Sequence, residues 1–432
     1  MFWEGIFTFK RLSRLVRSGD SQRFGLELEK DGETIVGQIA TNAAARLISM
    51  SAFVTAKVKK KDCVAYNAYP ENLVLRAIAN YIARRFKVIT SSRDRIVRGV
   101  TEALYDRTPI YVIRRDLSSF YETIPLEPVR SRLLYDTAIS RTIRHYLKEF
   151  YDTHCAGKTH GLPRGIGLTT ILVELAMEPF DRDIRAIPGV YRYFRYSDDM
   201  LIFAFKDQAG VAKKIDDAIA NLPGMKFNAS KSDMKSFDGE MNPLDAKKQP
   251  IPAPSTASFD FLGYSFKAEQ RVRRDKPRVV WLSIAEKKVK LIKTRIFLSL
   301  KAFEENGDSQ ALVDRLCVLS GNYRINRRGV HAIRRSRFIY AGIYYNYWRC
   351  GEYRNGNHVP TTPDCLSDID NFMHGFLSGK ASPFGAKIAA TLTPAQKARL
   401  KRLSFARGFE GKRMVRIPFN RFSKLKAIWR NA

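Results

Sequence analysis

The sequence has no long apolar run and no leader-like N-terminus. No stretch approaches the roughly 20 apolar residues that a bilayer-spanning helix needs. The chain opens on Phe2, Trp3 and Glu4, and the apolar segment that follows is too short and too interrupted for a signal peptide. We therefore expect a protein that is neither secreted nor inserted in a membrane.

Cysteine is scarce and unpaired in pattern. The five cysteines are scattered, and no two of them form a Cys-x-x-Cys pair. This usage is typical of a reducing cytoplasm and argues against a disulfide framework or a structural zinc. One small group, His154, Cys155 and His160, lacks a fourth ligand at any usual spacing, so we assign no metal to it.

Acidic residues are few beside the basic ones. The 432 residues include 75 Lys and Arg against 43 Asp and Glu, which gives a net charge of +32. Such an excess of cations predicts a polyanionic partner, and nucleic acid is the commonest one. An anionic membrane surface and a ribosome-type structural role are the alternatives. The length allows two or three domains with real cores.

Hydrophobic periodicity predicts a mixed α+β chain. Helical patterns and β-rich runs alternate up to about residue 270, and the strand signal fades after about residue 275. Residues 283–286 have the pattern of a capping box, which predicts a helix running toward residue 303. Helical patterns cover 72–110, with a break at 90–92, and 169–182; β-rich runs cover 111–113, 191–196 and 200–205. We expect an N-terminal extension at 1–70, a catalytic core at 71–270 and a helical, basic region at 271–432.

Two adjacent carboxylates interrupt a pair of β-rich runs. The runs 191–196 and 200–205 flank Ser197, Asp198 and Asp199, which predicts a hairpin with both acids at its turn. Adjacent carboxylates repel, and a site that keeps both ionised usually binds a divalent cation. An Asp-Asp pair is weak evidence alone. A second pair, Asp216 and Asp217, lies on a predicted solvated helix face and receives no function.

A third carboxylate makes the hairpin specific. Asp116 lies at the end of a β-rich run, where metal ligands are often found. Two such acidic elements can hold two Mg²⁺ ions roughly 3.5–4 Å apart, activating a 3′-hydroxyl and stabilising the leaving pyrophosphate. The alternative is that Asp116 only caps a helix.

Six segments in order resemble the motifs of reverse transcriptases. The resemblance covers about residues 85–265 and implies a right-hand polymerase fold, with fingers and palm followed by an α-helical, basic thumb and C-terminal domain. The six segments are 85–97, 116–124, 161–174 with a Leu-Pro-x-Gly loop, 196–199, 224–231 with an Asn-x-x-Lys element, and 259–264 with Phe-Leu-Gly.

The resemblance implies roles for individual residues. Asp116 and Asp198 would ligate two Mg²⁺ ions, which Mn²⁺ can replace, with help from Asp199 and the carbonyl of Leu117. Lys231 would protonate or neutralise the leaving pyrophosphate. The nucleotide would be bound by Arg85, Lys87, Tyr121 as a steric gate and Gly165, and the primer by Phe261, Leu262 and Gly263. Tyr121 as a core tyrosine and Arg85 as a solvated helix end remain alternatives.

Departures from the usual motifs point to one lineage. Arg164 replaces a Gln, Thr169 and Thr170 replace Ser-Pro, and Glu174 stands where intron enzymes often have Asn. The pattern resembles bacterial abortive-infection and defence-associated reverse transcriptases, including a subunit of the type 3 systems. That lineage implies a bacterial cytoplasmic protein, dNTPs, a structured non-coding RNA template, a DNA product, and a second reverse transcriptase subunit or a homo-oligomer.

The basic C-terminal region also predicts nucleic-acid binding. Lys287, Lys288 and Arg295 share one predicted helix, and Arg327 and Arg328 lie near several tyrosines in sequence. Cations interleaved with aromatics suit an RNA or hybrid backbone, although a solvated helix face would look alike. Two other functions stay open: a template-independent or protein-primed polymerase, and a catalytically silent RNA-binding scaffold.

Overall fold

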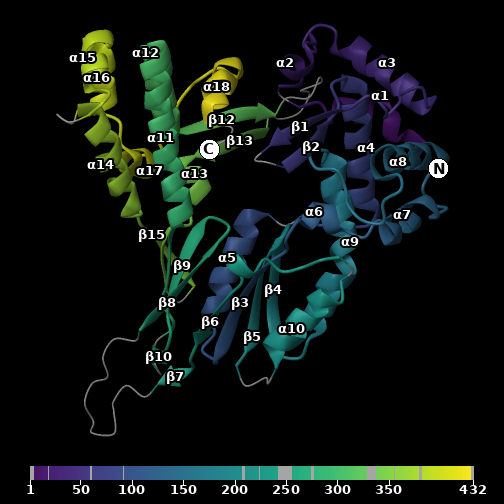
Figure 1. Cartoon of the computed structure of the whole chain (residues 1–432), viewed down its shortest axis with the longest axis horizontal. Helices are drawn as coiled ribbons and strands as arrows, with labels where there is room; N and C mark the ends of the chain where they lie inside the picture. Colours follow the sequence, from purple (N-terminus) through teal and green to yellow (C-terminus); the bar gives the residue numbers. More distant parts are fainter. Residues whose placement is uncertain are drawn as a thin grey trace. The chain divides into compact units, whose positions relative to one another are not determined.

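The chain folds into two compact units (Figure 1), which are described separately. Unit 1 comprises Met1–Ile96, Pro109–Ser236 and Arg327–Arg337, and unit 2 comprises Val97–Thr108, Phe237–Asn326 and Phe338–Ala432. This computed structural model describes residues 4–17, 19–58, 61–90, 92–206, 210–222, 224–241, 255–273, 277–327, 337–354, 356–378 and 382–429.

Unit 1 joins the N-terminal segment to the predicted catalytic core. Side chains of the first helices, such as Leu12 and Val36, belong to the same buried cluster as Leu73 of the longest N-terminal helix. Residues 1–70 therefore share a core with the segment after them. Its first elements are η1 (Glu4–Phe7), α1 (Phe9–Ser13), α2 (Asp20–Phe24), α3 (Gly32–Ala44), β1 (Val54–Val58), β2 (Lys61–Ala65) and α4 (Tyr69–Arg85), followed by α5 (Arg93–Leu104), which continues into unit 2.

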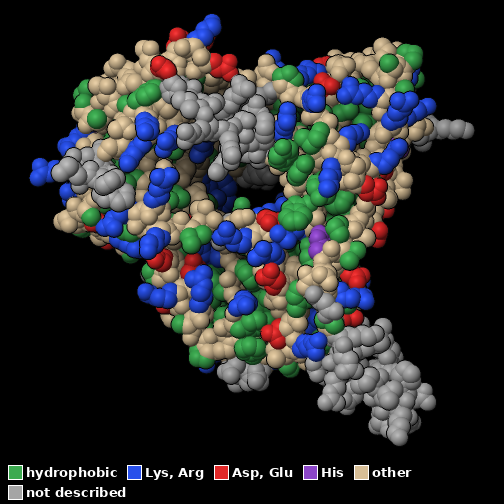
Figure 2. Space-filling view, turned by 180° about the vertical axis from the view of Figure 1, so that it is seen from behind, with side chains coloured by type: hydrophobic (Ala, Val, Ile, Leu, Met, Phe, Trp, Pro, Cys, Tyr) green, Lys and Arg blue, Asp and Glu red, His purple; other side chains and the backbone are tan. Residues whose placement is uncertain are grey.

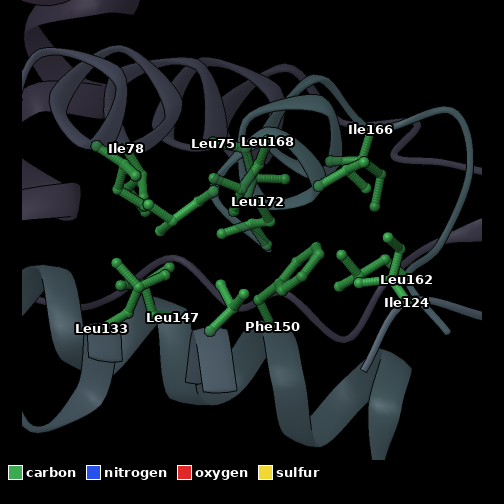
Figure 3. Packing of buried hydrophobic residues seen from close by; sticks show 14 of the residues in the cluster. Leu75, Ile78, Ile124, Leu133, Leu147, Phe150, Leu162, Ile166, Leu168 and Leu172 are labelled. Carbon is green, nitrogen blue, oxygen red and sulfur yellow. The ribbon is translucent and has the colours of Figure 1, made fainter. Parts of the chain in front are cut away.

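The helices of unit 1 meet in an apolar core (Figure 3). Leu75 and Ile78 from α4 point toward Leu147 and Phe150, and all four side chains are almost fully buried. The predicted helix at 169–182 is confirmed and extends to Gly167–Ala186, with Pro179 inside it. The remaining helices are α6 (Phe120–Thr123), α7 (Glu127–Leu134), α8 (Arg141–Cys155), α9 (Gly167–Ala186), α10 (Val211–Ala220) and η2 (Ala229–Lys231).

A four-stranded sheet with the order β4-β5-β3-β6 carries the candidate site. Strands β3 and β5 are antiparallel, as are β4 and β5. Ile113, Met200 and Ile202 on one face belong to the same buried cluster as Ile184 of α9 and Ile215 of α10. The strands are β3 (Ile110–Asp116), β4 (Val190–Tyr196), β5 (Asp199–Phe205) and β6 (Asp233–Phe237). The first three confirm the β-rich runs predicted from the sequence, whereas β6 was not predicted.

Unit 2 combines a five-stranded antiparallel sheet, in the order β15-β14-β11-β9-β8, with a group of helices. The strands after residue 237 are β7 (Glu240–Met241), β8 (Thr256–Phe261), β9 (Tyr264–Glu269), β10 (Val272–Arg273), β11 (Val280–Ile284), β12 (Asn322–Arg327), β13 (Arg337–Gly342), β14 (Gly351–Arg354) and β15 (Asn357–Pro360). The helices are α11 (Glu286–Asn306), α12 (Ser309–Leu319), α13 (Ile343–Tyr347), α14 (Cys365–Ser378), α15 (Gly385–Thr391), α16 (Pro394–Lys401), α17 (Phe405–Glu410), α18 (Phe419–Lys426) and η3 (Ala427–Trp429).

Two expectations for this region are wrong. The strand signal does not end at residue 275, because β11 to β15 follow it. The capping box at 283–286 is also absent, since Ser283 pairs with Ser265 inside the sheet and Ala285 precedes α11 without a side-chain cap. Short strands that pair with distant partners give a weak local hydrophobic pattern, so β11 to β15 were not predicted. Residues 283–286 at the end of β11 resembled a helix start for the same reason. The functional domain boundaries at 70 and 270 remain a prediction.

Basic side chains cover much of the visible face in Figure 2, with fewer acidic ones among them. No helix in the described part of the chain is long and apolar enough to cross a membrane.

Candidate active site

Asp116, Asp198 and Asp199 lie at the adjoining ends of strands β3, β4 and β5. Strand β3 ends at Asp116, and β5 begins at Asp199 directly opposite it. Asp199 also pairs with Tyr196 of β4, which leaves Ser197 and Asp198 as a two-residue turn. Directly opposite residues of antiparallel strands have Cβ atoms about 4.5–5.5 Å apart, and like charges there are destabilising. The predicted hairpin is therefore confirmed, and its acids need nearby cations.

Asp116 engages a lysine and an asparagine. The residue is only 3% exposed. Lys231 Nζ lies 2.9 Å from both carboxylate oxygens, and Asn228 Nδ2 donates to Oδ1 at 3.3 Å. The amide of Asn228 donates to the Asp116 carbonyl at 2.7 Å, which fixes the preceding loop beside β3. Asn228 and Lys231 of the segment 224–231 thus both contact the first aspartate.

Asp199 engages an arginine that sequence reasoning missed. Arg114 donates from Nε to Oδ1 at 3.0 Å and from Nη2 to Oδ2 at 2.9 Å. Arg114 lies two residues before Asp116 on β3, so it shares a face with Asp116 and is diagonal to Asp199. Strand alternation alone could have identified it. Bidentate pairing of this kind fixes both groups firmly.

Asp198 lies in the turn between β4 and β5. Its carbonyl accepts from the Leu117 amide at 3.0 Å, which joins the turn to the end of β3. Burial raises the pKa of Asp198, as does the charge of Asp116, while Lys231 and Arg164 act in the opposite direction. Burial also raises the pKa of Asp199, against the effect of Arg114. The three acids therefore form one electrostatic group in which each charge affects the others.

The predicted nucleotide gate is covered by an arginine. The guanidinium of Arg164 lies over the ring of Tyr121, 4.6 Å from its centroid. The same guanidinium donates to both oxygens of Glu122, from Nε at 2.6 Å and from Nη2 at 2.8 Å. This pair lowers the pKa of Glu122. Tyr121 is half-buried and packs edge-on against Phe120, so it has features of both a gate and a core residue.

Gly165 lies against the backbone of β2. Its φ is 95°, and a Cβ built there would lie 2.4 Å from the carbonyl oxygen of Val64 in β2. The amide of Val64 donates to the Arg164 carbonyl at 2.7 Å. The close approach that excludes a side chain is therefore made by the chain itself. Gly167, by contrast, faces open space.

A buried ion-pair network centred on Arg195 contacts the turn at Ser197 and Asp198. Arg195 of β4 is 8% exposed and contacts two acids of α9. Its guanidinium donates to both oxygens of Asp181 at 2.7 Å and to the two oxygens of Glu174 at 3.2 and 2.7 Å. Arg195 Nη1 also donates to the Ser197 carbonyl at 3.3 Å. Ser197 has a φ of 59°, a strained value for a residue other than glycine.

The second pair of adjacent acids, Asp216 and Asp217, is not simply solvated. Arg115 of β3 forms an ion pair with Asp216 of α10, with Nε 2.9 Å from Oδ1. The expectation of a free helix face is therefore wrong for Asp216, which ties α10 to the sheet. Asp217 is exposed, as expected.

The other predicted residues are in other elements, or their side chains are outside those that the structure describes. Arg85, in the last turn of α4, lies 3.4 Å from Asp136, and Lys87 is exposed with a φ of 52°. In unit 2, Leu262 and Gly263 form the turn between β8 and β9, and Phe261 is buried. Lys287, Lys288 and Arg295 lie on α11, as predicted. The side chains of Arg327 and Arg328 lie outside the described residues.

The donor chemistry of the carboxylate cluster suits a hard cation. Asp116, Asp198 and Asp199, with the carbonyl of Leu117, offer only oxygen atoms, which Mg²⁺ prefers. Burial disfavours the ionised forms of Asp198 and Asp199, so an added cation would stabilise them. Across the described residues, however, no three His, Cys, Asp or Glu side chains are gathered around one point. Because Lys231 contacts both carboxylate oxygens of Asp116, metal binding at Asp116 would compete with Lys231.

A family comparison matches the region that contains the candidate site. Residues 60–266 match the sequence model of the family described as reverse transcriptase (RNA-dependent DNA polymerase). A solved structure of apo telomerase from Candida tropicalis is similar at 15% identity and a TM-score of 0.30, covering 45% of this chain and 43% of that one. Telomerase from Candida albicans, in complex with the TWJ fragment of telomeric RNA, is similar at 12% identity and a TM-score of 0.31, covering 54% of this chain and 41% of that one. This chain thus spans less than half the length of either telomerase chain, and no curated protein matches it.

Proposed function

Because the chain contains a reverse transcriptase domain, we propose that it is an RNA-directed DNA polymerase and that the sheet of β3 to β6 is its palm. The observation that carries this proposal is the meeting of Asp116 with the turn at Ser197 and Asp198, beside Lys231. The fingers would come from the rest of the segment 71–270, and the thumb from residues 271–432.

In the proposed reaction a primer 3′-oxygen attacks the α-phosphorus of a dNTP, and the bond to pyrophosphate breaks. Two Mg²⁺ ions, or Mn²⁺ in their place, held by Asp116, Asp198 and the Leu117 carbonyl, would supply Lewis acidity to the entering and leaving oxygens. Lys231 would release Asp116 when that site is loaded, and its ammonium group could then donate a proton to the pyrophosphate. Asp199 would stay with Arg114 as a supporting acid.

Tyr121 is proposed to select the sugar. An aromatic ring held in place beside the incoming nucleotide would crowd a ribose 2′-hydroxyl and leave deoxyribose unaffected. Arg164 and Glu122 support this role because their ion pair fixes a cation against the ring face. Arg85 and Lys87 would bind the triphosphate, and Phe261, Leu262 and Gly263 would position the primer.

We further propose that the enzyme belongs to the bacterial defence-associated lineage and copies a structured non-coding RNA. The support is the set of departures at Arg164, Thr169, Thr170 and Glu174. Two of these have defined partners, Glu122 for Arg164 and Arg195 for Glu174. Sequencing the nucleic acid and identifying the proteins that co-purify with the chain would test the template and the second subunit together. An unrelated mixture of cellular RNA would contradict the dedicated template.

The site is tested by Asp198→Asn with Asp217→Asn as the matched control. We expect deoxynucleotide incorporation on an RNA template to fall on the order of a hundredfold or more in Asp198→Asn, because a buried charge that stabilises the reaction is lost. Asp217→Asn, which alters the exposed acid of the Asp216–Asp217 pair, should leave deoxynucleotide incorporation unchanged. Burial raises the pKa of Asp198, which means that its ionised form costs stability at neutral pH. The unfolding free energy of Asp198→Asn should therefore not be lower than that of the wild type.

Three outcomes would contradict parts of the proposal. Full activity in Asp198→Asn would remove the site assignment. No incorporation by the wild-type protein with any template, in Mg²⁺ or Mn²⁺, would favour the RNA-binding scaffold. Products that do not depend on template sequence would favour the template-independent polymerase.

A further inference from the structure

A basic pocket lies in unit 2, outside the segment that matches the reverse transcriptase family. The pocket has a volume of about 670 Å³ and is lined by Arg399, Arg402, Arg413 and Arg416 together with apolar side chains such as Met414. No acidic residue is among the described residues that line it. Residues 387–430 contain thirteen Lys and Arg but one acid, Glu410. A cavity of this size suits a nucleotide-sized ligand.

The wall that carries Arg413 and Arg416 is firmly built. Asn322 is fully buried and fastens the segment 412–416 to the start of β12. Its amide donates to the Arg413 carbonyl at 2.8 Å, and its carbonyl accepts from Val415 at 2.6 Å. Its side-chain Nδ2 donates to the carbonyls of Gly408 and Arg413 at 3.1 and 3.3 Å. The arginines therefore project from a fixed backbone, which favours a defined site over a flexible charged tail.

The opposite wall is helix α16. It begins with a reciprocal capping box between Thr393 and Gln396, which fixes its first turn. Arg399 and Arg402 follow at the end of this helix and are both exposed. Arg402 and Arg416 form no ion pair with any residue that the structure describes, so their charges face the solvent at the pocket.

The guanidinium of Arg413 lines the pocket with only part of its hydrogen-bonding capacity satisfied by described residues. Its Nη2 donates to Ser320 Oγ at 2.7 Å, but its buried Nε has no hydrogen-bond partner within the described chain. Burial lowers the pKa of Arg413, and the charges of Arg399 and Arg407 act in the same direction, while Asp370 opposes them. Asp370 itself accepts from Ser404 Oγ at 2.7 Å and from the Phe405 amide at 2.6 Å. A ligand with several anionic oxygens would offset the positive charges of Arg399, Arg407 and Arg413.

Cysteine chemistry does not account for this pocket. Cys317 lines it but is buried, and burial raises the pKa of its thiol. A protonated thiol is a poor nucleophile and a poor metal ligand. The distinctive chemistry of the pocket is therefore the group of guanidinium ions beside an apolar surface.

We propose that this pocket binds a phosphodiester-linked nucleotide of a single-stranded nucleic acid. Arg399 and Arg413 would bind one phosphate, and a base or sugar would lie against Met414, whose side chain is 39% exposed. Arg402 and Arg416 would contact a neighbouring phosphate, which is the reason to infer a strand and not a free nucleotide. The pocket would be a second contact for the nucleic-acid strand, remote in sequence from the palm. Strand binding at the pocket would not require polymerisation by the palm.

The proposal is tested by binding short single-stranded RNA and DNA to the full-length protein without dNTPs. The triple variant Arg399→Gln, Arg402→Gln and Arg416→Gln changes exposed pocket residues and leaves Arg413 intact. The matched control, Lys301→Gln, Lys401→Gln and Lys424→Gln, removes the same charge from exposed residues that do not line the pocket. We expect about tenfold or greater weakening in the pocket variant and under about threefold in the control. The salt slope should fall by up to about 1.4, since contacts to the two proposed phosphates contribute ~0.7 each.

Equal weakening in both variants would overturn the proposal, because it would show that only total charge matters. Complete displacement of the strand by ATP alone would also overturn it, in favour of a free-nucleotide site. A preference for RNA over DNA, or the reverse, would identify which strand occupies the pocket. Photocrosslinking of RNA to the wild-type protein checks the result without a variant: crosslinks should fall within residues 395–416, and crosslinks found only elsewhere would refute the site.

Discussion

At the scale of single residues, each acid of the candidate site has a different environment. Asp116 is held by Lys231, and Asp199 is held by Arg114, whereas Asp198 lies at the turn with a pKa raised by burial. A folded-state pKa above the ordinary value means that ionisation costs stability. This cost is absent below the ordinary pKa and develops as the pH rises through the raised one. The ionised form of Asp198 therefore lowers the stability of the folded chain, as expected where a charge is kept for function.

Sugar selection is also decided by one residue. If Tyr121 is the gate, Tyr121→Ala should lower the preference for deoxyribonucleotides by about ten- to a hundredfold, because a single steric contact contributes roughly 1–3 kcal/mol. The measurement is the ratio of kcat/KM for a dNTP and the matching rNTP. Tyr121→Phe keeps the ring under Arg164 and should keep the ratio. Tyr135→Ala removes a 78% exposed ring and is the control. An unchanged ratio in Tyr121→Ala would identify it as a core tyrosine.

At the scale of elements, helix α9 determines how the β4–β5 hairpin presents its turn. Glu174 and Asp181 of α9 both bind Arg195 of β4, and Arg195 reaches forward to the carbonyl of Ser197. Tyr193 adds a hydrogen bond to Asp181 at 2.8 Å. The positive φ of Ser197 is maintained by these surroundings. Arg195 is thus a positioning residue that acts on the site through the turn.

Arg195→Lys should separate this positioning role from stability. Lysine keeps the charge but cannot make the bidentate contacts, so we expect the unfolding free energy to fall by about 3 kcal/mol. We also expect kcat per folded molecule to fall by about tenfold or more with little change in the dNTP KM, because the turn loses its support. The control is Arg278→Lys, a fully buried arginine of unit 2 that donates to the carbonyls of Asp106 and Asp238. It should destabilise without changing kcat. If both variants change kcat equally, Arg195 has only a structural role.

At the scale of the whole molecule, the excess of basic residues dominates. A net charge of +32 on 432 residues creates a positive field that attracts nucleic acid from a distance. Lys and Arg lie over both units, and the structure does not confine them to the candidate site (Figure 2). Much of the affinity for RNA should therefore come from counterion release and should depend little on sequence.

The salt dependence of RNA binding measures this contribution. If six to ten phosphates are contacted, affinity should fall by about 10³–10⁵ between 50 and 200 mM salt. The measurement is the dissociation constant of a structured RNA at several salt concentrations, with a polyanion such as heparin as competitor. Affinity that is insensitive to salt would contradict an electrostatic mode of binding, whatever the palm does.

The sequence by itself determined the local features of the candidate site. Strand alternation and turn composition located β3, β4 and β5, and thus placed Asp116 at a strand end and Asp198 and Asp199 at a hairpin turn. Hydrophobic periodicity also located α4, α9 and α11. These predictions succeed because neighbours within a few residues decide whether such a segment is a strand, a turn or a helix.

Only the tertiary structure decided which distant side chains meet. The Lys231–Asp116 pair joins residues 115 positions apart, and the Arg114–Asp199 pair joins residues 85 apart. Strands β11 to β15, the contact of Gly165 with Val64, and the arginine pocket built on Asn322 likewise depend on segments that pair across long stretches of chain. Local propensity carries no information about such partners, because pairing is selected by burial and hydrogen bonding in the folded chain. The acids could therefore be found in the sequence, while the cations that surround them became visible only in the fold.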